Sequence, residues 1–163
     1  MTPIAGVPDR RRGVRGSIES ALLGIAARWQ LSWENVADYR RLGIIEAIAH
    51  ELAHALDLGS GFEAEIRTMG DARADDHEAR AIRIELAALD ALGVHLSARR
   101  LWVTANWRDP GIPIVRLRAA LDRREQSCVA RFVALVRREI ESEIEADQPR
   151  GAQVHTRRVR ADT

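Results

Sequence analysis

The chain contains no lysine and only one cysteine, and each shortage narrows what the protein can be. All 25 basic residues are arginine, which we interpret as the codon usage of a GC-rich bacterial or phage genome. Escape from lysine-directed tagging is the functional alternative. Because Cys128 is the only cysteine, no disulfide can form within the chain.

Long apolar runs and a strong net charge are also missing. No apolar run approaches the roughly 20 residues that a membrane helix needs, so we expect no membrane contact. Residues 1–15 are polar and arginine-rich, unlike the apolar segment of a signal peptide. We therefore expect a cytoplasmic protein. The formal net charge is +1, so no overall field would attract nucleic acid.

The 163 residues, 46% of them hydrophobic, are enough for one domain with its own core. We expect a mainly α-helical, compact domain over residues 17–147. A flexible arm over 1–16 precedes it and a disordered basic tail over 148–163 follows it. The arm and the tail carry arginine clusters without interleaved aromatic residues, so we do not expect nucleic-acid binding.

Apolar spacing and capping residues predict where the helices lie. Ser17 and Ser32 are suitable N-caps for helices that run to about Trp29 and Leu42. Gly43 weakens or bends the second of these helices. Residues 97–107 are ambiguous, because either a helix continues or a short β-hairpin forms near 101–117. The remaining predicted segments are a helix over 44–58, a polar loop over 59–74, and helices over 75–93 and 114–146.

The clearest chemical signal is the HExxH motif formed by His50, Glu51 and His54. Residues four apart on a helix project from one face, so both imidazoles can bind the same zinc ion. Glu51, beside the first ligand, can reach a metal-bound water and act as its general base. The sequence thus predicts a catalytic zinc site on the helix over 44–58.

The residues around the motif divide this helix into an apolar side and a polar stripe. The stripe would carry a metal site, but the exposed face of any surface helix shows the same pattern. The motif alone therefore leaves both interpretations open. The stripe consists of Glu46, His50, His54 and Asp57.

A catalytic zinc needs a third protein ligand, and the helix over 75–93 offers Glu78. On a helical wheel, Glu78 and Glu85 both lie in the middle of the apolar face. Buried carboxylates need a partner, which predicts that this helix packs on the HExxH helix. The alternative for Glu78 is a capping box with Asp75.

Two further acidic residues have less certain roles. Glu85 is either a hydrogen-bond acceptor for a ligand histidine or the partner of a buried arginine. Asp57 orients His54, closes the site from below, or is an ordinary residue at a helix end. Glu85 and Asp57 are also alternative metal ligands. His77 lies on the other side of the wheel from Glu78, so we expect it to be a surface histidine.

Residues 44–90 resemble the gluzincin-type peptidases, in which a second helix with a glutamate ligand follows the HExxH helix. More specifically, Glu78-Ala79, Ile82 and Glu85-Leu86 resemble the second helix of the ImmA/IrrE-like group. The resemblance implies zinc bound by His50, His54 and Glu78, with Glu51 as general base. Arg80 differs from the polar amide usual in that group, and no strand precedes residue 44 to hold a substrate.

The function expected from these observations is a zinc-dependent metallopeptidase acting on a peptide or protein substrate. The alternative is a non-enzymatic, or degenerate and metal-bound, helical interaction protein of phage or bacterial origin. It would use the 114–146 helix to dock a protein partner or a second copy of the chain. The stripe on that helix comprises Val129, Phe132, Val133, Val136 and Ile140, and it could instead pack on the domain.

Overall fold

The computed structural model describes residues 10–35, 43–59, 61–94 and 114–148, which are mainly helical and contain no β-strand. The expected mainly α-helical fold is confirmed. None of the described helices is long and apolar enough to cross a membrane. The elements are α1 (Arg10–Trp29), the 3-10 helix η1 (Trp33–Asn35), α3 (Ile44–Leu58), α4 (Phe62–Thr68), α5 (Asp71–Ala91), α7 (Ile114–Ala120) and α8 (Arg123–Asp147).

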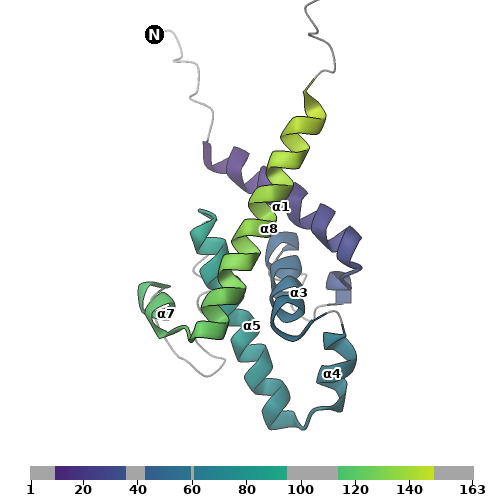
Figure 1. Cartoon of the computed structure of the whole chain (residues 1–163), viewed down its shortest axis with the longest axis vertical. Coiled ribbons are helices and arrows are strands. Elements are labelled where there is room, and N and C mark those ends of the chain that lie inside the picture. The colour runs from purple at the N-terminus through teal and green to yellow at the C-terminus, as the bar shows by residue number, and fades with distance from the viewer. Residues whose placement is uncertain (1–9, 36–42, 60, 95–113, 149–163) are drawn as a thin grey trace, which may run out of the picture.

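Helix α3 lies in the middle of the fold, and α1, α5 and α8 pack around it (Figure 1). Its bounds agree with the helix expected over 44–58, and 12 of its 15 residues are buried. The polar stripe is therefore not an exposed surface. Its members are each at most 9% exposed: Glu46, His50, His54 and Asp57.

The chain enters α3 through a turn at Gly43, whose φ is 95°. This left-handed conformation favours glycine, and it separates α3 from the preceding segment. Of the helix expected over 32–42, the structure describes η1; residues 36–42 lie outside the described residues. Helix α1 begins at Arg10, seven residues before the expected start at Ser17, because arginine favours a helix enough to offset nearby glycines.

The polar loop expected over 59–74 is wrong. Helix α4 occupies part of it, and α5 begins at Asp71 rather than at Asp75. Phe62 is 4% exposed, and burying this ring gives the short helix an inner face. Glu63 and Glu65 stabilise its first turn through the helix dipole. The glycines in this region therefore lie at helix ends rather than in an open loop.

The single helix expected over 114–146 is divided into α7 and α8. Asp122 ends the first and caps the second, because its carboxylate accepts a hydrogen bond from the Glu125 N–H at 2.7 Å. Residues 114–117 are helical, so the hairpin alternative is wrong there. Its remainder, residues 101–113, lies outside the described residues, as do residues 1–9 of the arm and 149–163 of the tail.

Candidate metal centre

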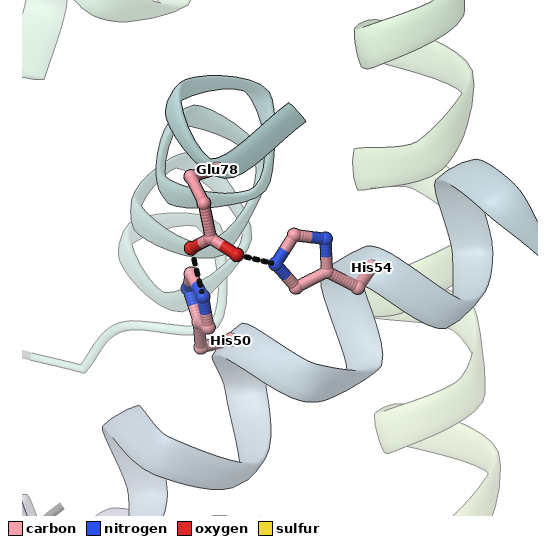
Figure 2. A group of neighbouring side chains, drawn as sticks. All are labelled: His50, His54 and Glu78. Atoms are coloured by element: carbon pink, nitrogen blue, oxygen red, sulfur yellow. Dashed lines mark hydrogen bonds and ion pairs between the residues drawn. The ribbon is translucent and has the colours of Figure 1, made fainter. Parts of the chain in front are cut away.

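The imidazoles of His50 and His54 and the carboxylate of Glu78 point toward one another between α3 and α5 (Figure 2). The Nε2 atom of His50 lies 2.9 Å from one oxygen of Glu78. The Nε2 atom of His54 lies 2.9 Å from its other oxygen. The expected packing of the glutamate-bearing helix on the HExxH helix is confirmed, and its carboxylate faces both histidines.

This donor set fits a zinc ion. One ligand atom from each residue lies within 4.8 Å of the other two. Tetrahedral zinc with bonds of about 2.0–2.1 Å separates its ligand atoms by roughly 3.3 Å, so small side-chain movements would suffice. Two imidazoles and one carboxylate are also a donor set found in catalytic zinc sites, where the fourth position stays open.

The centre has a buried wall and a side that solvent can reach. His54 is 2% exposed and His50 is 9% exposed. The side chain of Glu78, by contrast, is 31% exposed. A fourth ligand would therefore approach from the side of Glu78.

Glu85 lies behind His50 and is fully buried. Its carboxylate oxygen is 3.2 Å from His50 Nδ1, the ring nitrogen that faces away from Glu78. Ligand histidines usually make such a hydrogen bond, which fixes the ring orientation. Of the roles expected for Glu85, the structure shows an acceptor for histidine.

The two carboxylates control the charge on His50. Burial disfavours the charged ring, but hydrogen bonds with Glu78 and Glu85 outweigh it and raise the pKa of His50 to about 10. Burial likewise opposes the charge of Glu78, yet the two histidines hold the pKa of its carboxyl well below its usual range. Because a metal needs neutral imidazoles, its binding would release protons from this cluster.

The ring of His54 is held at Nε2 by Glu78 and on one face by stacking. It lies parallel to the ring of Phe62, with centroids 5.5 Å apart and planes at 8°. Within the described part of the chain, its buried Nδ1 atom has no hydrogen-bond partner. Helix α4 thus supplies a wall of the site that the sequence did not predict, although Phe62 and Ile66 already have helical spacing.

Glu51 is half-buried on α3 beside the histidines. Burial raises the pKa of its carboxyl; His50 and His54 oppose this shift, and the charges of Glu78 and Glu63 add to it. A carboxylate with a raised pKa is a stronger proton acceptor than an ordinary glutamate. The position and the acid–base character of Glu51 therefore suit a general base.

Asp57 does not orient His54. Its side chain is 1% exposed and pairs with Arg80 at 3.2 Å, Arg124 at 2.9 Å and His77 at 3.5 Å. His77 is mostly buried, with 14% of its side chain exposed, so the expected surface histidine is wrong. His77 contacts Asp57 at the end of α3, the helix that Glu78 also faces.

The capping-box alternative for Glu78 is also wrong, because Asp75 lies inside α5, whose N-cap is Gly70. Because α5 begins at Asp71, Glu78 is not at the position of a capping-box residue, and its carboxylate needs another explanation. Sequence patterns also gave no sign of the ion pairs made by Arg80 and Arg124. Each joins residues on different helices, so no local spacing reveals it.

The ion pairs of Asp57 make part of the stability depend on pH. Burial opposes the charge, but Arg80, Arg124 and His77 prevail and lower the pKa of Asp57. Its stabilising contribution is then complete above the unfolded value of about 3.9 and is lost as the pH falls through the folded value. We expect urea denaturation to show a steeper loss of stability below about pH 4 in the wild type than in Asp57→Asn. Equal pH slopes would contradict this assignment.

No family model, no curated protein and no solved structure matches the chain. The resemblance to the gluzincin-type and ImmA/IrrE-like peptidases therefore stays a prediction from the motif and the second helix. What the protein does has to be argued from the chemistry of the centre itself.

Proposed function

We propose that the protein is a zinc-dependent metallopeptidase in which Glu51 is the general base. The observation that carries the proposal is the convergence of His50, His54 and Glu78 from two helices. Glu51 occupies the position next to the first ligand, on the same helix. The donor set and the open side at Glu78 support a catalytic rather than a closed structural site.

Zinc held by these residues would lower the pKa of a bound water toward 7 and polarise a carbonyl oxygen. Glu51 takes up the proton of the attacking water and returns it to the leaving amine. Glu85 and Phe62 hold the rings of His50 and His54 in place. The buried wall behind the histidines keeps bulk water away from that side of the centre.

A groove of about 540 Å³ lies between the end of α1 and α4, and Phe62 is the residue that joins it to the centre. Phe62 belongs both to its wall and to the stack on His54. Trp29 and Leu31 add apolar surface, and Arg67 adds a positive charge. Among the described residues no β-strand offers an edge to a substrate, so in our proposal helices α1 and α4 bind the peptide.

The α8 stripe is divided between the core and the surface. Phe132 and Val136 are fully buried in the core, and Val129, Val133 and Ile140 pack partly against it. Val129 and Val133 also line an open groove of about 440 Å³, so the docking alternative keeps only the exposed part of the stripe. A degenerate, metal-bound protein would hold zinc without turnover. Comparing the turnover of the wild type with that of Glu51→Gln distinguishes it from the enzyme.

Metal content tests the first half of the proposal. We expect the purified wild type to hold about one zinc per chain and a His50→Ala/His54→Ala variant to hold almost none, by elemental analysis after dialysis. Zinc should also raise the melting temperature of the wild type. At a free concentration 100 times its Kd, a ligand adds about 2.7 kcal/mol to the stability of a folded protein.

A Glu65→Gln variant is the matched control, because Glu65 is exposed on neighbouring α4 and should keep its zinc. If the double variant does not fold, the melting temperature of the wild type with added zinc still tests metal binding, because it needs only the wild type and the metal. Equal zinc in the wild type and the double variant would rule out this centre.

A further inference from the structure

A network of ion pairs joins α3, α5 and α8 within one helical turn of the metal centre, with Asp57 in its middle. Asp57 follows His54 by three residues, and its side chain is 1% exposed. Arg80 binds both of its carboxylate oxygens, at 3.2 and 3.3 Å. Arg124 contacts the carboxylate at 2.9 Å and also donates to the backbone carbonyl of Asp57 at 2.6 Å.

Two partners of Asp57 flank Glu78 in the sequence. His77 immediately precedes it, and Arg80 follows two residues later. With about 100° per residue, His77 and Arg80 project from one flank of α5, roughly 60° apart. Glu78 projects about 100° away from His77. The contacts of Asp57 with His77 and Arg80 hold this flank of α5 against α3. They therefore set the rotation of α5 about its own axis, which turns Glu78 toward the histidines.

The same flank of α5 is also held to α8. Arg80 lies 3.0 Å from Asp122 and 3.4 Å from Glu125, and Arg83 lies 2.7 Å from Glu125. Glu125 is 2% exposed, whereas the side chain of Asp122 is 53% exposed, so the network runs from the interior to the surface. Neutralising Asp57 would leave Arg80 to the acidic groups of α8 alone and would remove the ion pair that holds this flank of α5 on α3.

We propose that Asp57 is a positioning residue for the metal. Its ion pair with Arg80 and its contact with His77 fix the rotation of α5 and so place Glu78 in the ligand set. The inference rests on the zinc binding proposed above. The role of Asp57 concerns this chain in particular, because the ImmA/IrrE-like group, which the chain resembles, usually has a polar amide at the position of Arg80.

The test compares zinc affinity in the wild type, Asp57→Asn and Glu139→Gln, each folded and in competition with a chromophoric chelator. We expect Asp57→Asn to weaken zinc binding about 10–100-fold, as loss of a residue that orients a metal ligand does. Glu139→Gln is the matched control, because it also neutralises a carboxylate paired with an arginine on another helix, Arg28 at 2.7 Å. That pair joins α1 to α8, so the affinity should stay at the wild-type value.

A second readout needs no metal. In zinc-free protein, the imidazole ¹⁵N resonances of His50 and His54 report their hydrogen bonds with Glu78. We expect Asp57→Asn to shift both sets of resonances and Glu139→Gln to leave them in place. If the wild type binds no zinc, the proposed function fails, and this readout still decides whether Asp57 positions Glu78.

Wild-type zinc affinity in folded Asp57→Asn would overturn the inference, as would an equal loss in Glu139→Gln. Unchanged histidine resonances in Asp57→Asn would overturn it as well. If Asp57→Asn does not fold, Arg80→Gln replaces it, because it removes the same Asp57–Arg80 ion pair, together with the pairs of Arg80 with Asp122 and Glu125. The expected loss of affinity and the expected shifts are the same for that variant.

Discussion

A Glu51→Gln variant is expected to fold and to hold zinc like the wild type while losing nearly all hydrolysis. The amide has the shape of the carboxylate but cannot take up the proton of the attacking water. General-base catalysis contributes about 10²–10⁴-fold to a rate, and we expect turnover to fall by that factor. His50, His54 and Glu78 are untouched by the change, so the metal content should stay at about one zinc per chain.

The substrate is unidentified, so the probes are fluorescently labelled casein and a degenerate fluorogenic peptide library, both assayed with zinc-loaded protein. Glu65→Gln again serves as the control, since it makes the same chemical change at an exposed residue that does not line the groove, and it should keep full activity. Wild-type turnover in Glu51→Gln would eliminate Glu51 as the base. A zinc-loaded wild type that cleaves neither probe would point to the degenerate alternative.

Replacing Phe132 with alanine is expected to destabilise the fold by about 3–5 kcal/mol, the usual cost of removing a buried aromatic ring. Phe132 is 0% exposed and lies on α8, which packs on α1, α3 and α5. Loss of the ring would leave a cavity where these helices meet. Since whole domains are stable by only about 5–15 kcal/mol, this one change should bring the protein close to unfolding.

Urea denaturation measures the effect, and Ile144→Ala is the control on the same helix. Ile144 is 55% exposed, so its truncation should change the free energy of unfolding by at most about 0.5 kcal/mol. Equal effects of the two substitutions would mean that the α8 stripe is not part of the core. The stripe would then again be a candidate surface for a partner.

Local signals predicted the HExxH helix well and its surroundings less well. The bounds of α3 follow from an uninterrupted run of good helix formers between Gly43 and Gly59. The sequence predicts a loop over residues 59–74, because the glycines and acidic residues of this segment outweigh the helical spacing of Phe62 and Ile66. Burial of Phe62 against His54 makes that segment a helix, and such a contact is not visible in the sequence of α4.

The division between α7 and α8 shows a similar limit. Apolar spacing alone favoured one helix over 114–146, because the pattern continues across the break. Asp122 interrupts it by capping α8, with its carboxylate on the Glu125 N–H. The cap was present in the sequence as Asp122-x-x-Glu125, but an acidic residue in a helical pattern has many other roles.

The two histidines and the glutamate of the motif can be predicted without the fold, because spacing within one helix establishes which side chains project together. Glu78 and Glu85 can be predicted in the same way, since a carboxylate on an apolar face requires a partner. The identity of those partners follows from the packing of the helices. Contacts between His50 and Glu78, or between Asp57 and Arg124, join residues 28 and 67 positions apart. Such contacts depend on how α3, α5 and α8 rotate and pack together, which no local pattern specifies.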